Sequence, residues 1–131
     1  MKNEGPQSGP GSGSRKQLGA KAEQIAAEYL QGKGYRIMAR NWRCRSGELD
    51  MIAGHEGRLV FVEVRSRRRT GRFGTPQESV NWRKQKQIRE TALVYLQQSG
   101  QLEAAVRFDV VAVSFDPDGR LAELTHLPGA F

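Results

Sequence analysis

The spacing of hydrophobic residues changes along the chain from a helical period to a strand-like period. Between residues 15 and 33 apolar side chains recur every three or four positions, which predicts an amphipathic helix that ends at a pair of glycines. Its apolar stripe consists of Leu18, Ala22, Ile25, Ala26 and Tyr29. Residues 35–42 alternate instead, which predicts a strand. One face of that strand is expected to hold Tyr35, Ile37 and Ala39.

Two β-prone runs around residues 54–57 predict a hairpin, because glycines bracket the polar pair between them. The arms are residues 48–53 and 58–65. A loop of two or four residues gives a register that pairs Ala53 with Arg58, Met51 with Val60 and Glu48 with Glu63. One face then carries Leu49, Met51, Val60, Val62 and Val64. The other carries Glu48, Asp50, Glu63 and Arg65, with Ile52, Leu59 and Phe61 nearer the tip.

The second half of the chain predicts a further helix and two further strands. Thr75–Pro76–Gln77–Glu78 has the residue types of an N-cap, a first helical position and a capping box, so a helix is expected from there to about Gln98. Residues 106–115 form a continuous β-prone run, and residues 120–126 alternate as an edge strand after a Pro/Gly turn. The expected fold is α/β, a mixed sheet flanked by helices in the order α-β-β-β-α-β-β.

Composition limits the class of protein. Residues 1–14 are rich in Gly, Pro and Ser, so we expect a disordered tail before a single domain over residues 15–131. No apolar stretch approaches the roughly 20 residues of a membrane span, and no signal-peptide core follows Met1. We therefore expect a cytoplasmic protein with no membrane association. The net charge of +7 favours a polyanionic partner, nucleic acid or an acidic membrane surface. The single Cys44 is interpreted as a small packing residue.

The polar face of the predicted hairpin gathers three carboxylates and one guanidinium. One interpretation is a solvated face on which Arg65 pairs with Glu63. The other is a site for a hard cation, because Mg²⁺ takes oxygen ligands and needs only one or two carboxylates besides water. Phosphodiester hydrolysis is the chemistry that such sites commonly serve. Glu23 lies at the edge of the first helix's stripe, where it is either solvated or faces a cleft.

Basic residues surround these carboxylates in the sequence. Residues 65–72 contain five arginines, and we interpret them as a phosphate-binding loop rather than a merely solvated one. Arginines also flank Trp42, an aromatic suited either to base stacking or to packing on the domain edge. Lys84 falls on the apolar stripe of the second helix, so its ammonium either reaches water or meets an anion at the sheet. The candidate nucleic-acid ligands are Arg43, Arg45, Arg67, Arg68, Arg69, Arg72, Arg83 and Lys86.

Two polar residues near the end of the chain have no evident catalytic role. Asp109 interrupts the apolar run on the face that also carries Arg107 and Val111. His126 shows no catalytic partner in the sequence, so it is interpreted as structural.

Five segments together resemble the YraN family of bacterial proteins. They are LGAKAEQIAAEYL, GYRIMARNWRCRSGELDMIA, LVFVEVRSR, FGTPQESVNWRKQKQI and RFDVVAV. The resemblance covers about residues 17–131. That family belongs to the restriction endonuclease-like superfamily and is distantly similar to archaeal Holliday junction resolvases. The resemblance therefore implies a restriction endonuclease-like core.

The resemblance also implies an active site. The superfamily uses a helix Glu, a hairpin Asp and a Glu-x-Lys on the next strand, which correspond to Glu23, Asp50, Glu63 and position 65. It implies a DNA endonuclease that depends on Mg²⁺ or Mn²⁺ and uses no small-molecule cofactor, with branched DNA as one candidate substrate. Because junction resolvases are dimers, a homodimer is a further hypothesis. The chain departs from the pattern at Arg65, since arginine stays protonated and is a poor general base.

Three hypotheses follow from these residues. The first is a metal-dependent nuclease in which Asp50 and Glu63 hold the metal. Glu23 assists directly or through water, Glu48 lies in support, and Arg65 with Lys84 stabilises the transition state. The second is a non-catalytic nucleic-acid-binding module that retains the fold. The third is a subunit that acts only within a larger assembly.

Overall fold

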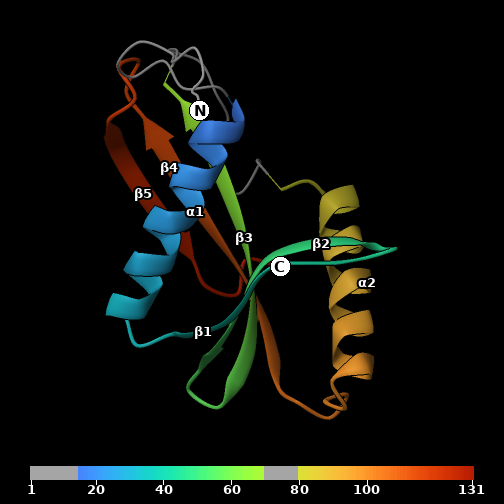
Figure 1. The fold of residues 1–131 in the computed structure, drawn as a ribbon. Coiled ribbons are helices and arrows are strands. Elements are labelled where there is room, and N and C mark those ends of the chain that lie inside the picture. The colour runs from blue at the N-terminus through green and yellow to red at the C-terminus, as the bar shows by residue number, and fades with distance from the viewer. Residues whose placement is uncertain (1–14, 70–79) are drawn as a thin grey trace, which may run out of the picture.

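The computed structural model describes residues 15–69 and 80–131 of the chain. Its elements follow one another in the predicted order α-β-β-β-α-β-β, which confirms the α/β fold class (Figure 1). They are α1 (Arg15–Gly32), β1 (Arg36–Cys44), β2 (Gly47–His55), β3 (Arg58–Arg68), α2 (Trp82–Gln98), β4 (Val106–Phe115) and β5 (Leu121–Leu127). The predicted tail, residues 1–14, and the predicted capping box at Thr75–Glu78 lie outside the described residues.

The five strands form one mixed sheet in the order β1-β2-β3-β4-β5. β3 and β4 run parallel, whereas the other neighbouring pairs are antiparallel. Parallel neighbours need a crossover connection, and α2 lies within the connection between β3 and β4. This arrangement is consistent with the restriction endonuclease-like core that the family resemblance implies. No helix in the described part of the chain is long and apolar enough to cross a membrane.

Each helix covers one face of the sheet. Val60 and Val62 of β3 pack with buried residues of α1, whereas Leu59 and Phe61 pack with buried residues of α2. The alternation follows from the two-residue period of a strand and divides the core into two apolar layers. In Figure 1, α1 lies along β3 and β4, and α2 lies beside the curved ends of β1 and β2.

Strand β1 is irregular, and this changes which side chains face the core. Its pairing with β2 shifts between Ile37 and Ala39, so Met38 forms a bulge. As a result Ala39 packs in the α2 layer while Tyr35 and Ile37 pack in the α1 layer. The prediction of one shared face for these three was therefore wrong. The strand also continues past Trp42, to Cys44.

The hairpin register differs from the predicted one by two residues. His55 pairs with Arg58, so Glu56 and Gly57 alone form the turn, with φ values of 51° and 78°. Two successive positive φ values are typical of the type I′ turn that matches strand twist. Gly54 and His55 extend the strand rather than the loop. The predicted pairs Ala53 with Arg58, Met51 with Val60 and Glu48 with Glu63 are consequently wrong.

The first half of β2 separates from β3. Pairing between these strands covers only Met51 to His55, whereas β2 stays paired with β1 as far as Gly47. The β1–β2 turn packs closely against α2 at Gly47. A Cβ added there would lie 2.9 Å from Gln87 Nε2 and 3.0 Å from Thr91 Oγ1, so the contact leaves no room for a side chain. Leu49 accordingly packs in the α2 layer rather than beside Met51 as predicted.

Helix α2 begins at Trp82, and Asn81, whose backbone is extended, is its N-cap. The Asn81 side-chain oxygen accepts a hydrogen bond from the Lys84 amide at 3.0 Å, the geometry of an N-cap. The prediction of a continuous helix from Thr75 was therefore wrong at Val80 and Asn81, while the predicted end at Gln98 is confirmed.

Candidate metal and nucleic-acid site

The point where β2 leaves β3 brings Asp50 and Glu63 together. Continuing the observed hairpin register by one residue places Asp50, not Glu48, opposite Glu63. Because the strands have separated there, the Val64 amide donates to Asp50 Oδ2 at 2.8 Å instead of to a backbone carbonyl. The Asp50 and Glu63 carboxyl groups are close enough to share a hydrogen bond. Strand divergence thus brings the partly exposed Asp50 against the buried Glu63.

Two cationic side chains meet the same oxygen of Glu63, which is only 5% exposed. Arg65 Nη1 lies 3.3 Å from Glu63 Oε2, and Lys84 Nζ lies 3.8 Å from it. Arg65 comes from the same strand two residues further on, whereas Lys84 comes from the first turn of α2. The structure therefore brings together four of the five predicted catalytic residues, and the apolar stripe position of Lys84 aims its ammonium at an anion.

The fifth predicted catalytic residue, Glu23, lies on α1. Asn41 lies between Glu23 and Glu48, and its side-chain nitrogen, oriented toward the carboxylates, donates to Glu23 Oε1 at 3.3 Å and Glu48 Oε2 at 3.1 Å. Glu48 also pairs with Arg43 at 3.3 Å. Glu23 and Glu48 therefore form a second acidic pair, with an amide and a guanidinium as partners.

The Asp50–Glu63 pair and the Glu23–Glu48 pair interact electrostatically, because the charge of Asp50 raises the pKa of Glu23. Burial, and next the neighbouring Glu63 carboxylate, raise the pKa of Asp50 to about 7, against the opposing effect of the Val64 amide and Lys84. Burial, followed by the charges of Asp50 and Glu48, raises the pKa of Glu23, with Asn41 and Arg40 acting in the opposite direction. Asp50 and Glu23 therefore keep their protons to a higher pH than isolated carboxyl groups do.

A bound divalent cation would compensate the negative charge of these carboxylates in place of protons. Within residues 15–69 and 80–131 no three His, Cys, Asp or Glu side chains are grouped so as to hold a metal ion by themselves. The Asp50–Glu63 pair nevertheless suits Mg²⁺ or Mn²⁺, since one or two carboxylates with water or phosphate oxygens complete an octahedral site. The donor set therefore fits a two-carboxylate cation site, with Glu23 placed to act through water.

The predicted nucleic-acid ligands occupy several surfaces. Several already have acidic or aromatic neighbours: Arg69 pairs with Glu123 at 2.9 Å, Lys86 with Glu90 at 4.0 Å, and the Arg83 guanidinium lies 5.5 Å from the Trp82 ring centroid. Arg45 is exposed at the β1–β2 turn, while Arg67 and Arg68 line a cavity beside α1. Arg72 lies outside the described residues. The predicted nucleic-acid ligands are therefore spread over separate surfaces.

A second buried acid, Asp109, was not predicted to have partners. Arg107 contacts both of its oxygens at 2.8 and 3.0 Å, Tyr35 donates to Oδ2 at 3.1 Å, and His126 Nε2 lies 2.8 Å from Oδ2. The Gly129 amide donates to Oδ1 at 3.1 Å. Burial alone would raise the pKa of Asp109, but the hydrogen bonds from His126, Arg107 and Gly129 outweigh it and lower the pKa well below its usual range.

The sequence held a partial signal for this network. Arg107 and Asp109 are two residues apart and share a strand face, so their pairing could have been proposed from spacing alone. Tyr35, His126 and Gly129 are distant in sequence, and only the sheet order brings them to Asp109. The structural role predicted for His126 agrees with its place in this network.

The chain is an α/β domain with one mixed five-stranded sheet and a helix on each face, an architecture consistent with the restriction endonuclease-like fold that the family resemblance implies. The model of the family described as "Uncharacterised protein family UPF0102" matches residues 22–113. The chain belongs to this UPF0102, or YraN, family, as the sequence segments indicated.

Curated relatives carry the same family name and match over nearly their whole length. A UPF0102 protein of Geobacter metallireducens is 43% identical over 88% of this chain and 93% of its own length. A UPF0102 protein of Desulforamulus reducens is 48% identical over 88% of this chain and 96% of its own. A third, of Symbiobacterium thermophilum, is 51% identical over 81% and 89%.

Proposed function

We propose that the protein is a divalent-metal-dependent DNA endonuclease whose centre is the Asp50–Glu63 pair. The observation that carries this proposal is the contact of the Asp50 carboxyl group with the buried Glu63 carboxyl group, with the pKa of Asp50 raised to about 7. Such an arrangement is costly unless a proton or cation compensates it, and pairs of this kind are concentrated at functional sites. Branched DNA is the substrate that the family's distant similarity to junction resolvases favours.

The roles of the residues follow from their positions. Asp50 and Glu63 would hold the cation, and Glu23 would orient a water molecule from the α1 side. When bound, the cation would polarise a phosphoryl oxygen and lower the pKa of water. Arg65 and Lys84, whose charges converge beside Glu63, would stabilise the additional negative charge on the phosphate in the transition state.

A non-catalytic nucleic-acid-binding module is the second candidate, and one observation favours it. Arg65 and Lys84 both pair with Glu63, so part of its charge is already compensated without a metal. Arginine also replaces the lysine of the superfamily pattern and cannot serve as a general base. In that case the surface would bind phosphates, and the acidic pair would keep a proton rather than bind a cation.

Cleavage assays separate the two candidates. Single-stranded, duplex, flap and four-way DNA are incubated with Mg²⁺ or Mn²⁺ and either wild type, Asp50→Asn or Glu63→Gln. These variants keep side-chain size while removing one charge each, and we expect each to lose at least about a hundredfold in rate, since metal ligation contributes several kcal/mol to the transition state.

The matched control is Asp118→Asn, which removes the same charge from an exposed acid of the β4–β5 turn. Its cleavage rate should equal that of the wild type. Full activity in Asp50→Asn and Glu63→Gln would exclude this site, and the absence of wild-type cleavage on every substrate would favour the binding module.

A further inference from the structure

A cavity of about 560 Å³ lies between the first turn of α1 and the end of β3. The described residues that line it are Arg15, Leu18, Val64, Arg65, Ser66, Arg67 and Arg68. Leu18 and Val64 pack against the α1 layer of the core and give the cavity an apolar base. The remaining residues are polar, and none of these described lining residues carries a carboxylate. The cavity is therefore a basic recess on a rigid support.

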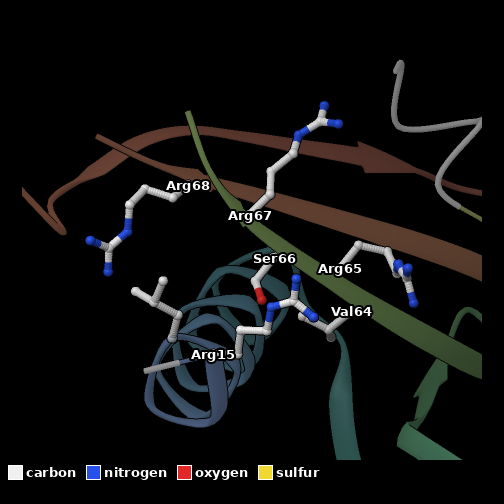
Figure 2. A pocket seen from close by; sticks show the side chains of 7 residues that line it. Arg15, Val64, Arg65, Ser66, Arg67 and Arg68 are labelled. Carbon is white, nitrogen blue, oxygen red and sulfur yellow. The ribbon is translucent and has the colours of Figure 1, made fainter. Parts of the chain in front are cut away.

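The side chains of this recess come from both elements. Figure 2 shows the Arg15 guanidinium and the Ser66 hydroxyl pointing toward one another, with Arg68 extending from β3 toward α1. Ser66 and Arg68 share a strand face with Val64, whereas Arg65 and Arg67 leave the opposite face and border the recess. Arg68 Nη1 also donates to the Pro117 carbonyl at 3.2 Å, which helps to fix its position.

This combination suits a phosphate group. Guanidinium groups match phosphate oxygens in a bidentate manner, and a serine hydroxyl adds a neutral donor. Several guanidinium groups around one concave surface raise the local positive potential, which favours an anion there. A small carboxylate would offer fewer acceptor oxygens to donors arriving from two elements.

We propose that this recess binds a phosphate group of a nucleic-acid strand whose neighbouring segment lies at the Asp50–Glu63 pair, an inference that rests on the proposed function. Ser66 follows Glu63 by three residues, about 10 Å along β3, and the two side chains leave opposite faces of the strand. Arg65 borders both places, since it lines the recess and contacts Glu63 Oε2.

Two sources of phosphate have the same chemistry, a terminal 5′-phosphate and an internal phosphodiester. Three labelled DNA probes of one stem sequence distinguish them: a hairpin with a 5′-phosphate, the same hairpin with a 5′-hydroxyl, and a closed dumbbell without ends. Affinities are measured by fluorescence anisotropy in EDTA, so that metal-dependent cleavage does not consume the probes.

The variants are Arg15→Gln and Ser66→Ala, with Arg58→Gln as the matched control. Arg58 is exposed at the opposite end of β3, and its replacement removes the same charge as that of Arg15. We expect Arg15→Gln to bind about tenfold more weakly, the effect of one lost hydrogen bond to a charged group, and Ser66→Ala to show a smaller loss. Arg58→Gln should stay within about twofold of wild type. Thermal unfolding verifies that each variant is folded.

A loss confined to the 5′-phosphorylated hairpin supports the proposal with a terminal phosphate as ligand, and an equal loss on all three probes supports it with an internal one. Equal affinities for Arg15→Gln, Ser66→Ala and Arg58→Gln would overturn it. This readout is independent of cleavage: Asp50→Asn should retain the Arg15-dependent difference. Failure of the nuclease assignment therefore leaves the recess result intact, and failure of the recess leaves any cleavage result intact.

Discussion

Asp50 and Asp109 lie on strands of the same sheet, but their surroundings shift their pKa values in opposite directions. Asp109 is fully buried and accepts hydrogen bonds on both oxygens from partners that are cationic or neutral donors. Asp50 accepts one backbone hydrogen bond and meets a second carboxyl group. The pKa is lowered at Asp109 and raised at Asp50. A buried acid with complementary donors stabilises the fold, whereas a carboxyl pair in which one pKa is raised is a candidate for binding a proton or a cation.

The comparison also explains where each acid lies. Asp109 is in β4, which pairs with a neighbour on each side. Its partners come from the residue just before β1, from β5 and from the segment after β5. Asp50 lies where β2 has left β3, and there its carboxyl group meets the Val64 amide and Glu63. The regular part of the sheet therefore carries the structural acid, and its divergent part carries the candidate site.

The largest effect on stability is expected from Asp109→Asn. This change leaves the mostly buried Arg107 guanidinium without its charged partner, and breaking such a pair costs about 3–5 kcal/mol of unfolding free energy. Urea unfolding at pH 7 measures it. Asp118→Asn, in an exposed pair with Arg120, should change stability by less than about 1 kcal/mol. Equal losses in the two variants would remove the distinction between a structural and a surface acid.

Asp50→Asn is expected to act on stability in a pH-dependent way. The folded state holds a proton on Asp50 up to about pH 7, whereas the unfolded chain releases it near the ordinary value of 3.8. The wild type therefore loses stability as pH rises through that window, by at most about 4 kcal/mol at about 1.4 kcal/mol per pKa unit. The variant lacks this loss, so in EDTA its stability relative to wild type should increase between pH 4 and pH 8.

Urea unfolding of both proteins at several pH values tests this expectation, and Asp118→Asn again serves as the control. Mg²⁺ needs the ionised pair, so it should raise the unfolding temperature of the wild type more at pH 8 than at pH 5.5. Parallel pH profiles for wild type and Asp50→Asn would contradict a raised pKa at this position.

A smaller effect is expected at Arg65, which lies at the border of the site. Arg65→Lys keeps the charge and restores the superfamily residue, so single-turnover cleavage with Mg²⁺ should be similar or faster. Arg65→Ala should be slower, because one of the two cations beside Glu63 is lost. Equal rates for wild type and Arg65→Ala would assign the electrostatic role to Lys84 alone.

The sequence predicted the element order because local periodicity and turn residues determine which segments are helices and strands. It missed the bulge at Met38, the hairpin register and the departure of β2 from β3, since each depends on tertiary packing such as the contact of Gly47 with α2. Asp50 and Glu63 were nevertheless chosen correctly as neighbours, because a register error of two residues preserves the face of each side chain.

Contacts between residues that are distant in the sequence could not be predicted from local sequence patterns. Nothing local to Asn41 indicates that its amide lies between Glu23 and Glu48, and nothing near Asp109 indicates the Gly129 amide. Arg15 and Ser66 were likewise not proposed as neighbours, because the contact of α1 with the end of β3 is set by core packing. Conversely, Lys84 was identified from its unusual position on an apolar stripe, a signal that local sequence does contain.

Direct measurement of Mn²⁺ binding tests the central claim, that the divergent acidic pair is a cation site and the Asp109 network is not. Electron paramagnetic resonance titration at pH 8 should show Mn²⁺ bound to the wild type and to Asp118→Asn with equal affinity. Asp50→Asn and Glu63→Gln should bind at least about tenfold more weakly, since each removes a ligand charge. Undiminished Mn²⁺ affinity in both folded variants, or no binding to the wild type, would contradict the account.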